Sequence, residues 1–240
     1  EGMFREASAF NQDLDSWNVS SVTNMKSMFD RATVFNGNLS NWNVSSVTDM
    51  NSMFANTTVF NGDLSSWNVS SVTNMSGMFA NTTVFNGNLS SWNVNNVKNM
   101  MGMFFNAVSF DQDLSSWDVS SVTTMVVMFG GDAKLAVANY NSILNSWSEQ
   151  SVQNGVTLDA PNCMYSSAAK AARQSLIDNH NWTINDGGKI IDISNLTPAA
   201  GTDNQGLNDN LIITFDKSVV VGTGNVRIYK ADDSLVETID

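Results

Sequence analysis

The chain has 240 residues, 42% of them hydrophobic, and its 11 Lys and Arg stand against 23 Asp and Glu, a formal net charge of −12. This balance excludes a nucleic-acid-binding protein, because phosphate contacts need clustered cations, and it disfavours docking on an anionic membrane. No apolar run approaches the roughly 20 residues that span a bilayer, so no direct membrane insertion is expected.

A tryptophan recurs every 25 residues, and most of the residues around it recur in step. A fixed period of roughly 20–50 residues is typical of a solenoid, in which each unit packs on its neighbour. We therefore expect residues 1–129 to form one repeat solenoid. The repeated tryptophans are Trp17, Trp42, Trp67, Trp92 and Trp117. Because Met3-Phe4 has the phase of Met28-Phe29, the chain begins in mid-repeat, and we expect a longer protein.

The apolar pattern of each 25-residue unit predicts one short strand and one short helix. Its apolar residues follow the pattern L-x-x-W-x-V-x-x-V-x-x-M, which is similar to the pattern of leucine-rich repeats. The alternation over Trp42–Val44 predicts a short strand, and the i, i+3, i+4 spacing of Met50, Met53 and Phe54 predicts a short helix. The predicted fold class is α/β, a leucine-rich-repeat-like solenoid of 25-residue coils.

Equivalent residues of stacked coils should form columns. The tryptophan, phenylalanine and methionine columns are expected in the core, where each buried side chain contributes roughly 1.5–3 kcal/mol. Asparagine also recurs, at Asn36 and Asn61 for example. Asparagine side chains bond backbone groups and accept left-handed turns, so polar ladders at the coil corners are predicted.

Residues 130–186 are predicted to form a C-terminal cap, because the repeat stops at Gly130-Gly131. An amphipathic helix, a strand over Val156–Leu158 and a second helix capped by Ser166 or Ser167 are expected there. The first helix would bury a face made of Ala136, Asn139, Tyr140, Ile143, Leu144 and Trp147, and the second a face made of Ala169, Ala172, Leu176 and Ile177. Neither the lone His180 nor the lone Cys163 lies in a catalytic or metal-binding motif.

Residues 187–240 are predicted to begin a β domain. Asn185–Gly188 has the composition of a linker. Strand-like segments follow at Lys189–Ile193, Leu211–Phe215 and Asn225–Tyr229, separated by turn-rich stretches as in a β-sandwich. Such sandwiches need about 100 residues, so we expect this domain to be truncated at Asp240.

The unit F-N-x-D/N-L-S-S-W-N-V-S-S-V-T-N-M-x-x-M-F resembles the BspA-type leucine-rich repeat of bacterial surface proteins, also described as the DUF285 repeat. Residues 190–240 resemble the start of a bacterial Ig-like domain of the SbsA type, through Ile193–Ala199, Leu211–Asp216 and Gly224–Lys230. The resemblance implies secretion, cell-surface display and adhesion to an extracellular protein or glycan. It implies no catalytic residues and no cofactor.

The predicted function is an extracellular binding module without catalytic activity. Three hydroxyl columns next to the predicted strand are the candidate ligand contacts. They consist of Ser20, Ser21, Thr23, Ser45, Ser46, Thr48, Ser70, Ser71 and Thr73. Alternatives are a spacer that holds another domain away from the cell and, more remotely, an ice-binding protein that uses the pairs Thr57-Thr58 and Thr82-Thr83.

Calcium is the one metal for which the sequence offers ligands, at Asp13, Asp63 and Asp113. Asn38 and Asn88 occupy the same phase, so the repeat does not require a carboxylate there. An enzyme such as a glycosidase needs paired carboxylates in a cleft, and the acidic residues here are scattered.

Overall fold

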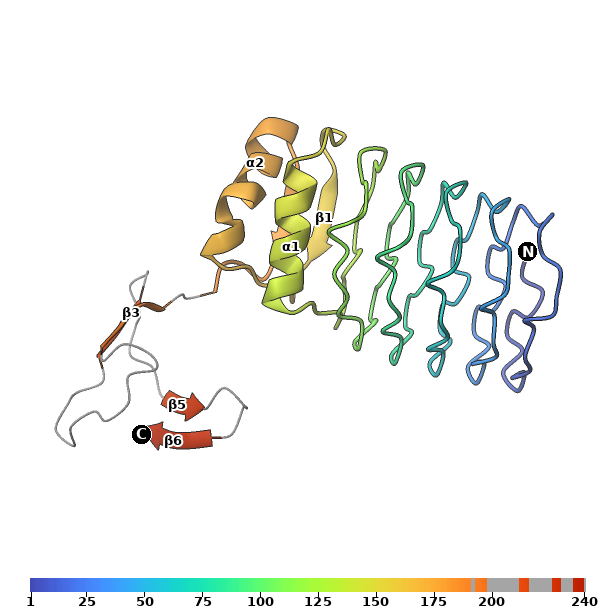
Figure 1. The fold of residues 1–240 in the computed structure, drawn as a ribbon, viewed down its shortest axis with the longest axis horizontal. Coiled ribbons are helices and arrows are strands. Elements are labelled where there is room, and N and C mark those ends of the chain that lie inside the picture. The colour runs from blue at the N-terminus through green and yellow to red at the C-terminus, as the bar shows by residue number, and fades with distance from the viewer. Residues whose placement is uncertain (191–192, 198–211, 216–225, 230–234, 240) are drawn as a thin grey trace. The chain divides into compact units, whose positions relative to one another are not determined.

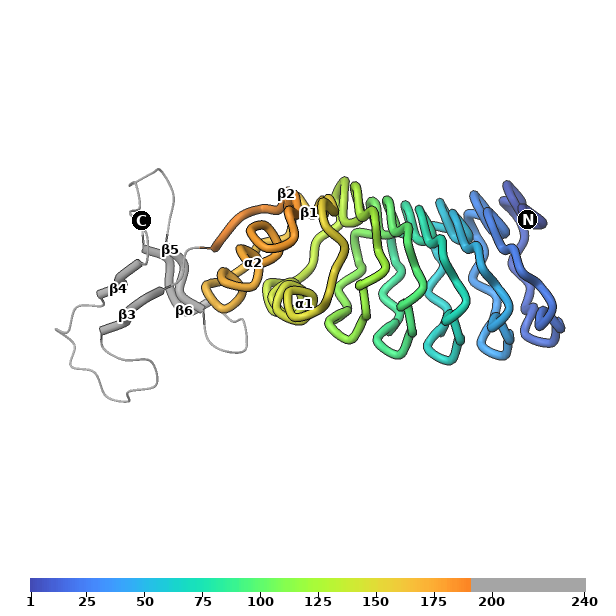
Figure 2. Tube along the Cα trace, turned by 90° about the horizontal axis from the view of Figure 1, so that it is seen from above, coloured from blue at the N-terminus to red at the C-terminus, as the bar shows by residue number. Residues whose placement is uncertain are grey.

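The computed structural model describes residues 1–190 with their side chains and the backbone of residues 193–197, 212–215, 226–229 and 235–239. The chain divides into two compact units, Glu1–Ile190 and Ile191–Asp240, each of which is described by itself. In the first unit, successive 25-residue coils lie side by side in chain order, from blue to green in Figure 1 and from above in Figure 2. Helices and a small parallel sheet follow the coils, so the described fold is mixed α/β.

A ladder of backbone hydrogen bonds joins each coil to the next along one side. The N–H of Ser27 donates to the carbonyl of Asn51 at 2.8 Å, and the N–H of Phe29 to that of Met53 at 2.9 Å. The same bonds recur one repeat later. Isolated parallel bridges mark the start of this ladder at Asn24, Asp49, Asn74, Asn99 and Thr124. We call residues 1–6, 24–31, 49–56, 74–81, 99–106 and 124–131 the ladder segments, and the exposed side that they form the ladder face.

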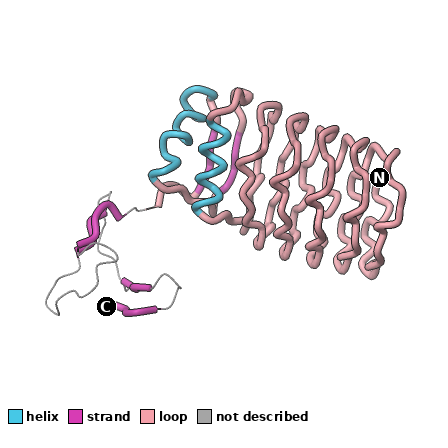
Figure 3. The backbone as a smooth tube through the Cα atoms, in the orientation of Figure 1, coloured by secondary structure: helices cyan, strands magenta, loops and turns pink. Residues whose placement is uncertain are grey.

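The ladder segments contain no helix, so the helix predicted at Met50–Phe54 is wrong (Figure 3). Ser52 has φ 54° and Asn56 has φ 61°, and left-handed residues interrupt a right-handed helix. Alternate N–H groups then point away from their own segment and bond the next coil. The chain forms consecutive tight turns, which place Met50, Met53 and Phe54 in the core as a helix face would.

The strand predicted at Trp42–Val44 is also wrong, because this side of the coil makes no backbone ladder. Side chains bridge the coils there instead. The indole Nε1 of Trp42 donates to the carbonyl of Leu14 at 2.7 Å, and the N–H of Asn61 donates to Oδ1 of Asn36 at 2.9 Å. Both bonds recur in the following coils. The predicted asparagine ladders are therefore confirmed, and they satisfy backbone groups that a β-sheet would otherwise pair.

The core consists of aromatic and methionine columns, as the period predicted. In one column Phe29, Phe54, Phe79, Phe104 and Phe129 stack with ring centroids 5.6–5.8 Å apart. Four of the five repeated tryptophans are at most 3% exposed. Trp17 is 40% exposed.

Two helices and a two-stranded parallel sheet close the first unit after the coils. Helix α1 (Val137–Ser148) buries four of its predicted face residues, namely Tyr140, Ile143, Leu144 and Trp147. Strand β1 (Thr157–Ala160) continues the ladder through a parallel bridge from Met125 to Leu158. Ser166 caps the 3₁₀ turn η1 (Ser167–Ala169), which leads into helix α2 (Lys170–His180). Both helices and the strand were predicted.

Strand β2 (Thr183–Asp186) pairs in parallel with β1 and was not predicted. Asn185 and Asp186 belong to this strand, so the linker predicted over Asn185–Gly188 is wrong at these two residues. Asp186 is instead a buried anchor of the first unit, as shown below.

The second unit contains two antiparallel pairs in its described residues. Strand β3 (Ile193–Thr197) pairs with β4 (Ile212–Phe215), and β5 (Val226–Tyr229) pairs with β6 (Leu235–Ile239). The strands predicted to start at Leu211 and Asn225 correspond to β4 and β5, although these two starting residues lie outside the described ones. Residues 191–192 of the strand predicted at Lys189–Ile193 also lie outside the described residues. No described helix is long and apolar enough to cross a membrane.

Truncating one ring of the core column should destabilise the coils. Phe79 is fully buried, and we expect Phe79→Ala to lower the free energy of unfolding by about 3–5 kcal/mol. Val84→Ser is the control, because Val84 is exposed and Ser109 occupies its column one repeat later; a change within about 0.5 kcal/mol is expected. Urea denaturation measures both, and similar losses in the two variants would contradict the column.

Val127 adopts φ 50° at a position where three other coils carry the glycines Gly2, Gly77 and Gly102. A left-handed conformation costs an L-residue roughly 1–2 kcal/mol. Glycine avoids this cost, but it loses more conformational entropy on folding, which cancels part of the gain. We expect Val127→Gly to stabilise the protein by about 0.5–1 kcal/mol in thermal unfolding. Val126→Gly, at a residue without positive φ, should destabilise it instead, and equal losses in both variants would refute the strain.

Candidate functional site

The nine predicted contact residues lie in three columns beside the ladder face, and most of their hydroxyls already have partners. Thr48 Oγ1 donates to the carbonyl of Thr23 at 3.2 Å, and Ser46 Oγ donates to that of Ser20 at 2.8 Å. Four more of these hydroxyls donate a hydrogen bond, namely those of Ser71, Thr73, Ser20 and Ser45. The hydroxyls of the other three, Ser70, Ser21 and Thr23, donate none among the described residues. Two of the three columns therefore join coils, while Ser20 and Ser45 bond an asparagine of their own coil. The bonded hydroxyls offer mainly lone pairs to any ligand.

The ladder face is charged at its N-terminal end. Arg5 lies 3.3 Å from Asp30, and Arg31 lies 3.2 Å from Glu6. The Arg31–Glu6 pair is exposed on both sides and adds little stability, whereas Asp30 of the other pair is largely buried. In the middle of the face the same columns hold neutral polar residues such as Asn51 and Ser76.

The ladder face becomes apolar at its C-terminal end. Met101 is 46% exposed, Val126 37% and Val127 38%, and Phe105 beside them is half-buried. We call these four residues the apolar patch. Exposed apolar clusters on a polar surface mark contact sites. The sequence analysis missed the patch, although its signal is visible in the sequence: Met101 and Val126 stand where earlier units carry Glu1, Lys26, Asn51 and Ser76.

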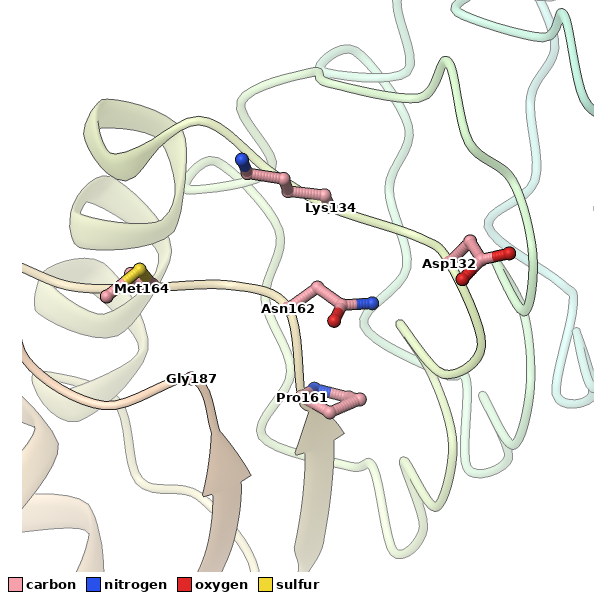
Figure 4. A pocket seen from close by; sticks show the side chains of 6 residues that line it. All are labelled: Asp132, Lys134, Pro161, Asn162, Met164 and Gly187. Carbon is pink, nitrogen blue, oxygen red and sulfur yellow. The ribbon is translucent and has the colours of Figure 1, made fainter. Parts of the chain in front are cut away.

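A depression of about 440 Å³ lies between the ladder and the closing sheet (Figure 4). Asp132 and Lys134 come from the segment before α1, Pro161, Asn162 and Met164 from the segment after β1, and Gly187 from the end of β2. The charged ends of Asp132 and Lys134 lie apart and point in different directions, and Asn162 Nδ2 is used to hold the carbonyl of Gly131. The depression therefore gathers no set of converging groups.

A second, polar groove runs where the last coil meets α1. Its lining consists of Ser115, Ser116, Asp118, Ser120, Ser146, Gln150 and Ser151. Gln150 donates to the carbonyl of Trp117 and accepts from the N–H of Val119, and Ser146 donates to Ser115. These groups fasten α1 to the coils, so the groove is a junction between elements.

The buried polar cluster of the first unit surrounds Asp186. Arg173 binds this carboxylate through Nε at 2.7 Å and Nη2 at 3.1 Å, and the Tyr140 hydroxyl donates to it at 3.1 Å. The guanidinium also lies 5.1 Å from the ring centroid of Tyr165. Burial alone would lower the pKa of Arg173, but the hydrogen bond and the charge of Asp186 outweigh it and raise that pKa. The cluster joins α1, α2 and β2.

Neither potential nucleophile in this region is activated. Burial, and then the charge of Asp186, raise the pKa of Tyr140 well above its ordinary value. Burial is also the main cause that raises the pKa of Cys163 to about 11. Both side chains are 0% exposed. They remain protonated and inaccessible at neutral pH, which suits packing and not nucleophilic catalysis.

The described residues contain no group of three His, Cys, Asp or Glu placed to hold a metal ion. Asp13, Asp63 and Asp113 each accept a backbone N–H at 2.9 Å, from Asn38, Ser65 and Ser115. The side-chain and backbone hydrogen bonds of Ser65 lower the pKa of Asp63. Asp63 and Asp113 act as turn caps, a role that asparagine fills at Asn38 and Asn88, whereas Asp13 joins its coil to the next one.

Comparison with known families gives one match. The family described as "Mycoplasma protein of unknown function, DUF285" matches residues 1–81 and 58–174, which together span more than half of the chain. The chain belongs to the DUF285 family. This confirms that part of the predicted resemblance, and the family's description indicates a bacterial origin. DUF285 covers all the coils, α1, β1 and the first turn of α2.

No curated protein matches the chain. No solved structure matches it either. DUF285 membership therefore carries no assigned activity, and the functional argument rests on the surface of the protein itself.

The buried ion pair should be essential to the closing elements. Asp186→Asn leaves the Arg173 charge without its counterion, and we expect the free energy of unfolding to fall by about 3 kcal/mol. Asp178→Asn on the exposed face of α2 is the control and should change it by less than about 0.5 kcal/mol. Chemical denaturation measures both. A loss no larger than that of the control would show that the cluster contributes little.

Proposed function

We propose that this chain is a non-catalytic binding module on the outside of a bacterial cell, and that it recognises an extracellular protein or glycan. In this proposal the coils are a leucine-rich-repeat-like solenoid over residues 1–129 with a cap over 130–186. The apolar patch is the observation that carries the proposal. A purely structural array gains nothing from exposing Met101 and Val126 where its other coils are charged or polar, or Val127 where they carry glycine or serine.

The rigidity of the coils supports a binding role. The ladder bonds, the stacked rings and the asparagine ladders fix each surface position relative to its equivalent one repeat away. A surface that is already ordered loses little conformational entropy when it binds a partner. An extended array of this kind suits recognition of a large ligand.

Surface display and the nature of the second unit are further parts of the proposal. The BspA-type resemblance of the repeat favours secretion. Residues 187–240 would begin an Ig-like domain of the SbsA type, and the antiparallel pairs β3–β4 and β5–β6 are compatible with that assignment.

A spacer is the second candidate, and one observation favours it. The hydroxyls of Ser46, Thr48 and Ser71 are engaged between coils, so the columns that looked most suited to a ligand also have a structural role. Ice binding has less support. Thr57 and Thr82 are buried, and only Thr58 and Thr83 of the predicted pairs reach the surface.

A binding screen separates the module from the spacer. The full 240-residue chain is tested against immobilised glycans and extracellular-matrix proteins, together with two variants. One variant carries Ser45→Ala and Ser70→Ala in the hydroxyl columns, and the other carries Met101→Ser in the apolar patch. We expect saturable binding to at least one ligand that one of the variants weakens by about fivefold or more. If the chain binds nothing across the screen, the binding module fails and the spacer is favoured.

A further inference from the structure

Met101 and Val126 depart from the repeat, whereas three of the other exposed valines belong to it; Val108 is a separate exception, in a column that carries Thr33, Thr58 and Thr83. Val34, Val59 and Val84 form one regular column on another side of the coils, at ordinary backbone angles. Met101 and Val126 instead replace charged or polar residues of their column. The patch is therefore a local feature of the last two coils.

Val127 is exposed and strained at the same residue. Its φ of 50° is unusual for a β-branched side chain, and glycine fills this position in the preceding coil as Gly102. Strained residues that stability does not explain cluster at functional sites. The strain is thus a second observation, independent of exposure, that points to the same patch.

Most backbone donors beneath the patch are already bonded. The N–H groups of Met100 to Asn106 all donate to carbonyls or to Asn99, and the N–H of Val127 donates to Asp159 Oδ2 at 2.7 Å. Strand addition needs unpaired backbone groups, so it has little to use on this surface. Recognition would therefore rest mainly on the side chains of the patch.

The charges around the patch select the partner. Residues 76–97 include no charged residue. The three ladder segments 74–81, 99–106 and 124–131 contain none either. The next layer, β1, contributes the carboxylate of Asp159 directly beside Val127. With a net charge of −12 on the whole chain, a partner segment that carries cations is attracted and an acidic one is repelled.

We infer that Met101, Phe105, Val126 and Val127 bind a basic amphipathic segment of another protein, with its apolar side chains on the patch and a cation beside Asp159. This inference rests on the proposed binding function and names the partner of one surface. The strained Val127 completes the apolar contact, which glycine at that position would not.

The test uses the full chain and two labelled peptides in fluorescence anisotropy. One peptide consists of leucine and lysine at helical spacing, and the other has glutamate in place of every lysine. We expect the lysine peptide to bind saturably with one peptide per chain, and the glutamate peptide to bind at least about tenfold more weakly. Failure of the lysine peptide to bind, or equal binding of both peptides, overturns the inference.

Matched variants separate the patch from general attraction to an acidic protein. Met101→Ser with Val127→Gly should weaken binding of the lysine peptide by about fivefold or more, although Val127→Gly alone should raise thermal stability. Val59→Ser with Val84→Ser removes two valines from the other side and should change binding by less than about twofold. Equal effects of the two double variants would leave electrostatics alone as the cause and overturn the inference.

Two further outcomes have defined meanings. If sedimentation shows a concentration-dependent dimer that the patch variant abolishes, the patch is a contact between copies of this chain, and the inference is overturned. If the screen of the preceding section finds a ligand but the patch variant binds it unchanged and the lysine peptide does not bind, the binding module stands and this partner assignment fails.

Discussion

Every second N–H in a ladder segment donates to the next coil instead of to its own segment, and the rest of the first unit depends on this alternation. It requires left-handed residues at two positions of each ladder segment, such as Ser27 and Arg31. Those residues cost conformational energy, and the stacked phenylalanine and tryptophan columns offset it. A single coil could not offset this cost, because its backbone N–H groups and its aromatic rings both need an equivalent coil beside them.

The sequence predicted the stacking well because a period is a property of the whole array. It placed Phe60 and Trp67 in columns, found α1 and α2, and offered Ser166 or Ser167 as a cap, of which Ser166 caps η1. It failed inside the coil, where Met50, Met53 and Phe54 follow helical spacing although the chain makes tight turns. The signal against a helix was the Gly or Asn that recurs at Gly77, Asn81 and Gly102, residues that favour left-handed angles.

The candidate site was harder to predict, because a search for repeated positions in the sequence selects residues that recur in every coil. The hydroxyl columns repeat, and the structure gives most of them bonds between coils. Met101 and Val126 depart from their columns, so a search for regularity passes over them. Asp186 was missed for another reason: its neighbours Gly187 and Gly188 suggest a linker, and only tertiary structure brings Arg173 and Tyr140 to its carboxylate.

The near identity of the inner coils has a consequence for how such a protein can change. An internal duplication or deletion of 25 residues between Phe35 and Phe85 would join coil ends that already match, in rings, asparagine ladders and turns. The closing helices would sit on the same final coil as before. The length of the array can therefore vary by one coil rise at a time, about 5 Å, while the last two coils keep their surface.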